Sequence, residues 1–582
     1  MSKNNNYKLI WIFLLAALCV CAFIAKVRLF IIGFDIDEQY AVSLAYRLAK
    51  GDMPVLEMWE PHQTSAFLPG IFLKIYMGIT GSADYAVIAL RIFGALIQGL
   101  VAYGWYRCFS KDYDKYYVAL SALLIFSALP KWIQTPEFAN QQIWWMFALI
   151  ASLSKALKKD GFWWGVLAGI FMCLEVISYP GAVIVCVAVL VLMAVYRKFR
   201  TLAGMIACPA VIGGTVSVSL LAKIGWAEMS ECVSMILADP SHKESLTQKL
   251  LGYFKDFEIL AVYMLVTGVS IALIWFAVRR LSAKKLSAQI LCLIALTAAM
   301  VWQYIQWFVL ERTNTYASYF WLAAMISAFI LVEHNRLFAL TLTVSISGII
   351  SVLLMTNLDL YACLIHLIPM TALLLMTGFD SSSSRAANAG DQLTTGGTAV
   401  KEVQTPTGGI AVKEAQMPKG GIAVSRTITA LWVLLIILSY VCLVRVTEGW
   451  HNDVFMVKQK VLAGPAKGIY CEYVNGTYFN MLNDAVSPYI NEKDNVLYIG
   501  MNSLAPAVWN AGCSNASTIS TPYFDERYLE YFEINPAKRP SVVLLDKDYM
   551  ARHGADVPII ADVYEMYPEI VYENDDVMVR RR

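Results

Sequence analysis

A cluster of acids near the amino terminus carries the side chains best suited to chemistry. Asp35, Asp37 and Glu38 fall within four residues, directly after the first long apolar run. Carboxylates this close repel one another, so we expect one of them to have a raised pKa. A carboxylate poised in this way can take a proton from a hydroxyl group or hold a divalent cation.

A second polar group follows in the same predicted loop. Glu60, His62 and Gln63 lie around Pro61 in a stretch that is otherwise rich in apolar residues. A single surface histidine is usually inert, but this one has polar neighbours and shares its loop with the acidic cluster. We therefore predict that Glu60, His62 and Gln63 orient a substrate or a metal ion.

A structural alternative exists for the acidic cluster. The residues from Tyr40 to Lys50 have helical spacing, and Asp37 or Glu38 could cap that helix, because carboxylates favour amino-terminal turns. The cluster would then belong to a capped helix on a membrane surface. We favour chemistry, because one cap needs only one of these acids.

The elements that position these groups are predicted to be membrane helices. The 582 residues are 58% hydrophobic and only 15% charged, whereas soluble proteins average about 25% charged residues. The net charge of +2 is too small to indicate a nucleic-acid partner. The first apolar run lacks a small-residue cleavage site, so we expect a retained helix and not a removed signal peptide.

The fold class predicted is a polytopic α-helical membrane protein with a small carboxy-terminal extracytoplasmic α/β domain. About thirteen transmembrane helices are expected, at residues 8–32, 84–106, 116–130, 138–155, 162–178, 180–196, 202–224, 258–278, 287–308, 318–333, 337–356, 359–377 and 427–446. Loops rich in lysine and arginine should face the cytoplasm. This rule gives a multi-pass protein of the cell membrane, with its amino terminus inside and both the 33–83 loop and the carboxy-terminal domain outside.

The domains follow from changes in composition. Residues 1–378 form the predicted transmembrane catalytic domain, and 379–426 is a repetitive polar linker that we expect to be disordered and cytoplasmic. The last transmembrane helix, 427–446, leads into the α/β domain, 447–582. Cys471 and Cys513 of that domain could form a disulfide or remain as thiols, because spacing alone does not settle the matter.

The order of these motifs resembles the GT-C superfamily of membrane glycosyltransferases. An Asp-Glu motif after the first span, an amphipathic helix ending Leu-Ala-Lys-Gly-Asp, a Glu-Pro segment and an apolar helix carry the resemblance, within residues 35–91. The protein O-mannosyltransferase-like and aminoarabinose-transferase-like branches are the most similar. The Lys-Pro-Pro often seen in the second branch is replaced by Glu60-Pro61-His62-Gln63, which leaves the substrate open.

This resemblance implies a polyprenyl-phosphate-linked sugar donor and an acidic catalytic base in the first outer loop. Asp37 is the first candidate for that base, with Asp35 and Glu38 as neighbours. The family usually has a second acid in the next outer loop, where Glu137 stands, although Glu137 could simply cap a helix after Pro136. No cofactor is certain. Mg²⁺ or Mn²⁺ is a candidate, held by Asp35, Asp37 and Glu137, but basic side chains could also supply the charge.

A lipid phosphate needs cations near the membrane boundary. The candidates in the sequence are Arg91, His242, Lys243 and Arg312. Arg91 lies inside a predicted span, so it must pair with a carboxylate or a phosphate, or line a wet cavity. A helix-capping turn at His242 and Lys243, and a surface ion pair at Arg312, are the structural alternatives.

The function expected is transfer of a sugar, with inversion, to a hydroxyl group of an extracytoplasmic glycan, glycolipid or protein. One alternative is a lipid-sugar flippase or transporter, which usually has repeated halves and charges at mid-membrane. Another is a polysaccharide polymerase or ligase, which usually has its chemistry on a large late outer loop. The early position of the acids and the absence of a clear repeat favour the transferase.

Overall fold

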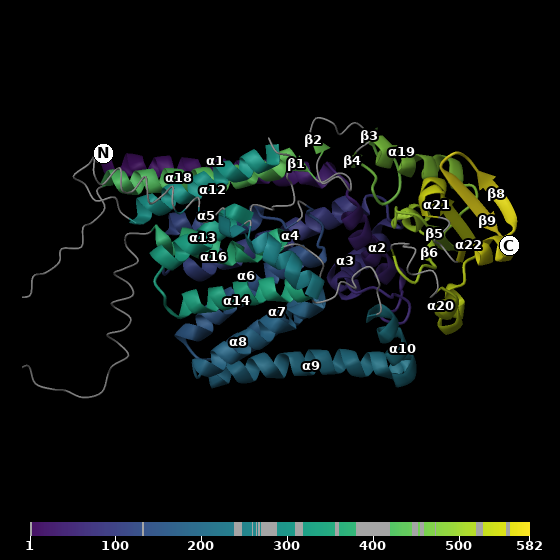
Figure 1. Ribbon diagram of the computed structural model, residues 1–582, viewed down its shortest axis with the longest axis horizontal. Helices are drawn as coiled ribbons and strands as arrows, with labels where there is room; N and C mark the ends of the chain where they lie inside the picture. Colours follow the sequence, from purple (N-terminus) through teal and green to yellow (C-terminus); the bar gives the residue numbers. More distant parts are fainter. Residues whose placement is uncertain are drawn as a thin grey trace, which may run out of the picture.

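Most of the chain forms a long bundle of helices with an α/β domain at one end (Figure 1). The computed structural model describes residues 3–130, 133–237, 247–258, 260–262, 265, 268, 288–308, 318–355, 360–379, 419–444, 452–453, 459–471, 473–518, 528–553 and 559–582. The predicted linker, 379–426, lies mostly outside these described residues.

Apolar runs account for the helices of the bundle. They are α1 (Lys3–Ile31), α4 (Ala86–Phe109), α5 (Lys115–Ser127), α6 (Phe138–Lys158), α7 (Phe162–Ser178), α8 (Val183–Val195), α9 (Phe199–Ile224), α10 (Trp226–Leu237), α12 (Ala288–Phe308), α13 (Ser318–Leu331), α14 (Arg336–Met355), α15 (Leu360–Cys363), α16 (Ile368–Leu373) and α18 (Lys419–Cys442). Short turns η2 (Pro180–Ala182), η4 (Leu364–Leu367) and η5 (Leu374–Gly378) extend α8, α15 and α16.

Within the described residues, six helices are long and apolar enough to cross a membrane. Each predicted span other than 258–278 coincides with a helix or a helical run, and 258–278 lies largely outside the described part of the chain. The structure therefore supports a polytopic helical protein without establishing the count of thirteen.

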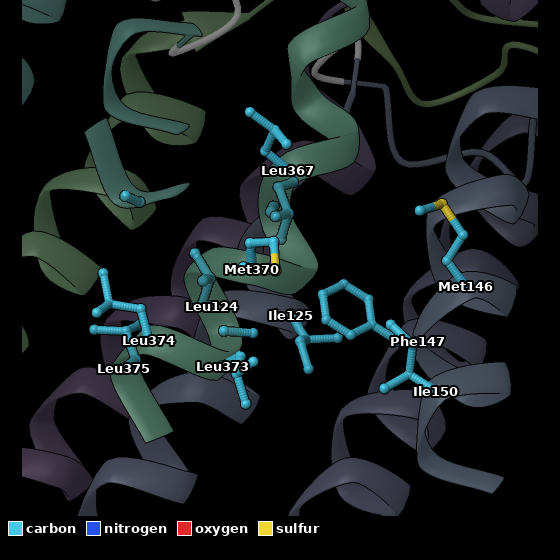
Figure 2. Packing of buried hydrophobic residues seen from close by; sticks show 14 of the residues in the cluster. Leu124, Ile125, Met146, Phe147, Ile150, Leu367, Met370, Leu373, Leu374 and Leu375 are labelled. Carbon is cyan, nitrogen blue, oxygen red and sulfur yellow. The ribbon is translucent and has the colours of Figure 1, made fainter. Parts of the chain in front are cut away.

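The centre of the bundle is an apolar core. Leu124 and Ile125 of α5, Phe147 and Ile150 of α6, and Met370 of α16 are at most 2% exposed. Figure 2 shows these side chains from the three helices pointing toward one another. Burial of such surface at about 25 cal/mol per Å² is the main force that holds soluble cores together, whereas in a membrane the same packing acts through dispersion contacts.

The 33–83 segment forms a layer at the domain end of the bundle. It contains α2 (Ile36–Lys50), η1 (Gln63–Ala66) and α3 (Phe67–Thr80). Asp35 caps α2 at its start, and Gly51 ends it with φ +106°, a left-handed conformation that glycine adopts without strain. Gly70 lets α3 lie close to α2, because a Cβ there would lie 2.9 Å from Cβ of Leu48.

A five-stranded sheet forms the carboxy-terminal domain. The strands are ordered β6-β5-β7-β9-β8, and β5 runs parallel to both β6 and β7 while β9 is antiparallel to β7 and β8. Their bounds are β5 (Asn495–Ile499), β6 (Gly512–Cys513), β7 (Val542–Asp546), β8 (Glu569–Glu573) and β9 (Val577–Arg581). Buried β5 and β7 and the terminal strand pair confirm the α/β prediction.

Helices and short strands complete the domain. They are α19 (Tyr473–Met481), η6 (Leu482–Val486), η7 (Ala505–Trp509), α20 (Tyr528–Ile534), η9 (Pro536–Lys538), α21 (Lys547–His553), α22 (Ile559–Met566), β1 (Leu443–Val444), β2 (Asn452–Asp453), β3 (Gln459–Lys460) and β4 (Tyr470–Cys471). Cys471 and Cys513 are both buried, and no disulfide joins them.

The domain packs directly on the 33–83 segment. Phe34 and Leu73 share one apolar cluster with Ile469, Phe479 and Leu504. The backbone N–H of Gly33 donates to the carbonyl of Tyr470 at 2.8 Å. These contacts place the acidic cluster between the helical bundle and the sheet domain.

Candidate functional site

The three acids of the cluster have different surroundings at the start of α2. Asp35 is fully buried and its carboxylate accepts the backbone N–H of Asp37 at 2.9 Å. The helix cap is therefore Asp35, and not Asp37 or Glu38 as the structural alternative proposed. Glu38 is 1% exposed. Asp37 is only half-buried. Of the three, Asp37 is the acid that a substrate can reach most easily.

Glu38 is paired with Arg91 of α4. Nε of Arg91 donates to Oε1 of Glu38 at 2.7 Å, and the terminal nitrogens of Arg91 donate to Oε2 of Glu38 and to backbone carbonyls at the end of α1. The hydroxyl of Thr135 donates to the same carboxylate. The sequence predicts a carboxylate, a phosphate or a wet cavity around Arg91, and in the structure its partner is the carboxylate of Glu38. The Glu38–Arg91 pair and the carbonyl contacts of Arg91 link α1, α2 and α4.

The loop at 133–137 brings the second predicted acid to this region. Glu137 is the N-cap of α6 and its carboxylate accepts the backbone N–H of Asn140 at 3.1 Å. Nε2 of Gln141 donates to the carbonyl of Ser65 at 2.7 Å, which joins α6 to η1. Glu137 is thus a capping residue, as its structural alternative predicts, and it lies on a loop that contacts the acidic cluster through Thr135.

Three aromatic rings meet on one side of this region. His62 stacks on Phe138, with ring centroids 4.2 Å apart, and on Tyr179 at 5.7 Å. His62 comes from the segment before η1, Phe138 from the start of α6, and Tyr179 from the end of α7. Aromatic rings such as these suit contact with the face of a sugar ring.

Glu60 and Gln63 hold the loop that carries His62. Glu60 is 3% exposed, and it accepts hydrogen bonds from the Tyr40 hydroxyl at 3.0 Å and from the backbone N–H of Thr518 in the sheet domain. Burial raises the pKa of Glu60, and the Thr518 hydrogen bonds partly oppose the shift. Oε1 of Gln63 accepts the N–H of Val55 at 2.6 Å. Both side chains are occupied in positioning the loop.

Three of the predicted binding residues fall in parts of the chain that the structure does not describe. His242, Lys243 and Arg312 lie outside the described residues. Within the described part of the chain, no three histidine, cysteine or acidic side chains are grouped so as to hold a metal ion. The Mg²⁺ or Mn²⁺ site at Asp35, Asp37 and Glu137 stays a prediction from the sequence.

Several buried polar residues were not among the residues predicted from the sequence. Lys26 of α1 is 3% exposed, and its Nζ donates to Oε1 of Gln98 at 2.8 Å and to Oε1 of Gln134 at 2.6 Å. Arg47 of α2 is 1% exposed and pairs with Asp52 at 2.9 Å. A lysine inside the first apolar run is a signal that could have been used, because charges there are costly unless they are bonded.

One comparison, the search of solved structures, finds a similar fold. No family model and no curated protein matches the chain. Among solved structures, ArnT from Cupriavidus metallidurans in the apo state has a TM-score of 0.53 at 10% identity, over 100% of this chain and 98% of ArnT. The same ArnT bound to undecaprenyl phosphate has a TM-score of 0.50 at 10% identity, over 99% and 98% of the two chains.

An archaeal structure is also similar over most of this chain. The oligosaccharyltransferase AglB from Archaeoglobus fulgidus, in complex with an inhibitory peptide and a dolichol-phosphate, covers 97% of this chain and 73% of its own, with a TM-score of 0.39 at 13% identity. The likeness to ArnT is one of fold, and it agrees with the resemblance that the sequence motifs indicate.

Proposed function

We propose that this chain is a membrane glycosyltransferase that moves a sugar from a polyprenyl-phosphate-linked donor to a hydroxyl group of an acceptor. The observation that carries the proposal is the position of Asp37. It is the accessible member of an acidic cluster where α2, the 133–137 loop and the sheet domain meet. This cluster lies in a fold shared along its whole length with ArnT, which has been solved bound to undecaprenyl phosphate.

Asp37 acts as the general base in this mechanism. Its carboxylate takes the proton of the acceptor hydroxyl, and the hydroxyl oxygen attacks the anomeric carbon of the donor sugar. The bond between that carbon and the phosphate oxygen breaks, and polyprenyl phosphate leaves with the electron pair. A single displacement of this kind inverts the anomeric configuration.

The neighbouring residues position the base. Asp35 holds the first turn of α2, and the Glu38–Arg91 pair fixes that turn against α4. A buried pair with several further hydrogen bonds is rigid, which keeps the carboxylate of Asp37 in place for proton transfer. The His62 stack offers an apolar wall for a sugar ring.

The charge on the departing phosphate needs separate cations. We propose His242, Lys243 and Arg312 for this role, because Arg91 already has its donors bonded to Glu38 and to backbone carbonyls. The acceptor in this scheme is a glycan, a glycolipid or a protein, since each offers hydroxyl groups. The domain end of the bundle is proposed to face outward.

The test compares Asp37→Asn with wild type in cells that lack the chain. Lipid-linked sugars and surface glycans are measured by mass spectrometry. Removal of a general base lowers the rate by about 10²- to 10⁴-fold, so the lipid-linked sugar should accumulate and the transferred glycan should be lost. Asp84→Asn is the matched control, because Asp84 also lies at the domain end but pairs with Lys467 at 2.8 Å.

The result that removes the proposal is normal glycan transfer by Asp37→Asn at an unchanged protein level. A transporter would give a different pattern, since its loss would leave the donor trapped on one face of the membrane without a change in transfer by extracts. Assays on intact vesicles and on detergent extracts separate these two functions.

A further inference from the structure

An apolar cavity of about 690 Å³ lies between α4, α6 and α7. Its wall contains Phe93 and Ile97 of α4, Trp145 of α6, and Leu167 and Phe171 of α7. A volume of this size lies within the range of about 300 to 1,000 Å³ typical of ligand pockets, and helix bundles are a common place for them. The proposed transfer reaction assigns no role to this cavity.

The two basic residues of the cavity lie at its end away from the sheet domain. Arg107 is in the last turn of α4 and Lys155 is near the end of α6, while both helices begin at the domain end. Lys155 lies ten positions after Trp145 in α6, which is a rise of about 15 Å along the helix at 1.5 Å per residue. This length matches half of a hydrocarbon core of about 30 Å, which is one leaflet.

Two acids at this end form ion pairs with cations other than Arg107 and Lys155. Asp112 pairs with Lys158 at 2.6 Å, and Asp114 pairs with Arg426 at 2.7 Å. The described residues give Arg107 a ring contact with Tyr103 but no carboxylate partner. Nζ of Lys155 donates to the carbonyl of Cys108 at 2.6 Å, which leaves two of its three N–H groups for another acceptor. The cavity is thus an apolar channel that ends in two cations, and this is complementary to a lipid with an anionic head group.

We propose that this cavity binds an anionic diacyl phospholipid of the leaflet at that end. The phosphate lies between Arg107 and Lys155, and one acyl chain fills the channel toward Trp145. Basic pockets between membrane helices bind anionic head groups in this manner. The proposed glycosyl donor is a poorer occupant, because its phosphate must lie near Asp37 at the opposite end of the bundle.

The probes are phosphatidylglycerol and phosphatidylcholine, titrated into the delipidated full-length protein and counted by native mass spectrometry. The wild-type protein should retain more phosphatidylglycerol than phosphatidylcholine. The double variant R107Q/K155Q should bind it at least about tenfold more weakly, since each cation contributes to head-group binding. The matched control is K111Q/K159Q, which removes two exposed lysines at the same end that do not line the cavity.

A second variant fills the channel without changing charge. Gly104 lines the cavity, and a Cβ added there meets no described atom within 4 Å, so Gly104→Phe should occupy the channel and abolish lipid retention. Gly78→Phe is its control, because Gly78 of α3 also has open space but lies outside the cavity. Thermal unfolding of each variant verifies that the protein is folded.

Three results would overturn the assignment. Equal retention of the two lipids by wild type removes the charge argument, and so does an equal loss of binding in K111Q/K159Q. A rise in the KM for the lipid-linked sugar in Gly104→Phe, with unchanged phosphatidylglycerol binding, would assign the channel to the tail of the donor. Native mass spectrometry needs no activity, so failure of the proposed transfer reaction leaves this test intact.

Discussion

Asp37 and Glu38 are adjacent in the chain, but their side chains have opposite surroundings. Glu38 is buried against Arg91 and Thr135, whereas Asp37 keeps part of its surface exposed. A carboxylate bonded by a guanidinium is held in a fixed position, which suits a positioning role. A more accessible carboxylate can approach an acceptor hydroxyl, which suits a base. The division of roles that we propose within the cluster therefore follows from burial.

The Glu38–Arg91 pair should contribute strongly to stability. Glu38→Ala leaves a guanidinium buried without its carboxylate, and the loss of one partner of such a pair costs about 3–5 kcal/mol. The measurement is thermal unfolding of the detergent-solubilised protein. Lys158→Ala is the control, because Lys158 and Asp112 form an exposed pair that should be worth less than about 1 kcal/mol. Equal shifts in the two variants would contradict the assignment.

Glu60 should make stability depend on pH. Burial raises its pKa above the ordinary value of 4.5, so just above that pH the native state keeps a proton that the unfolded chain has lost. The free energy of unfolding attributable to Glu60 therefore falls as the pH rises from 4.5 through the raised pKa. Glu60→Gln should remove this component, which unfolding curves collected from pH 4 upward would reveal. An unchanged slope in the variant would show that other groups cause it.

At the scale of the element, glycines decide how closely two helices pack. Gly165 of α7 faces Thr201 of α9, and a Cβ on Gly204 of α9 would lie 2.7 Å from the backbone nitrogen of Val166. Small residues at such crossings let helix backbones approach in membrane proteins. The close packing of α7 against α9 therefore depends on glycines, which have no side chain to separate the two backbones.

Two glycines of α9 should respond to alanine in opposite directions. Gly204→Ala must separate the helices and should cost about 1–3 kcal/mol, as overpacking does. Gly213 has open space among the described atoms, so Gly213→Ala should be neutral or stabilise by up to about 1 kcal/mol through helix propensity. Thermal unfolding of both variants in the same detergent tests the contrast. Destabilisation of similar size in both would rule out a close crossing at Gly204.

At the scale of the whole molecule, the sheet domain holds the 33–83 segment in place through packing, an ion pair and hydrogen bonds. Trp59 is 1% exposed and packs edge-on against Tyr531, with ring centroids 5.2 Å apart. Nζ of Lys538 bonds Asp52 at 2.5 Å, and the Tyr531 hydroxyl donates to the carbonyl of Glu57 at 2.9 Å. The loop that carries His62 is thus held by the domain as well as by the helices.

Loss of the Trp59 contact should loosen the domain. Trp59→Ala removes a fully buried aromatic side chain and should cost about 3–5 kcal/mol. Limited proteolysis should then cut the chain more quickly near the domain, with weaker sugar transfer as a consequence. Trp163→Ala is the control, since Trp163 is 78% exposed and its removal should leave the digestion pattern unchanged. Digestion of Trp59→Ala at the wild-type rate would contradict the role of this contact.

The sequence alone determined the elements of this protein. The apolar runs predicted the helices, and the strand-like and helical segments after residue 447 predicted the α/β domain. The acids near Asp37 predicted a candidate site. These properties are local, because a run of apolar residues or a cap acts through neighbours in the chain. The capping role of Glu137 was predicted for the same reason, whereas the cap of α2 is Asp35 and not Asp37 or Glu38.

Only the tertiary structure decided which groups meet. The partners of Glu38 are Arg91 and Thr135, and Glu60 is bonded by Thr518, which is 458 positions away. A hydrogen bond depends on a separation of about 3 Å between atoms, and the spacing of residues along a chain does not fix that distance. For this reason the sequence placed Arg91 among the ligand-binding candidates, whereas the folded chain places it against Glu38.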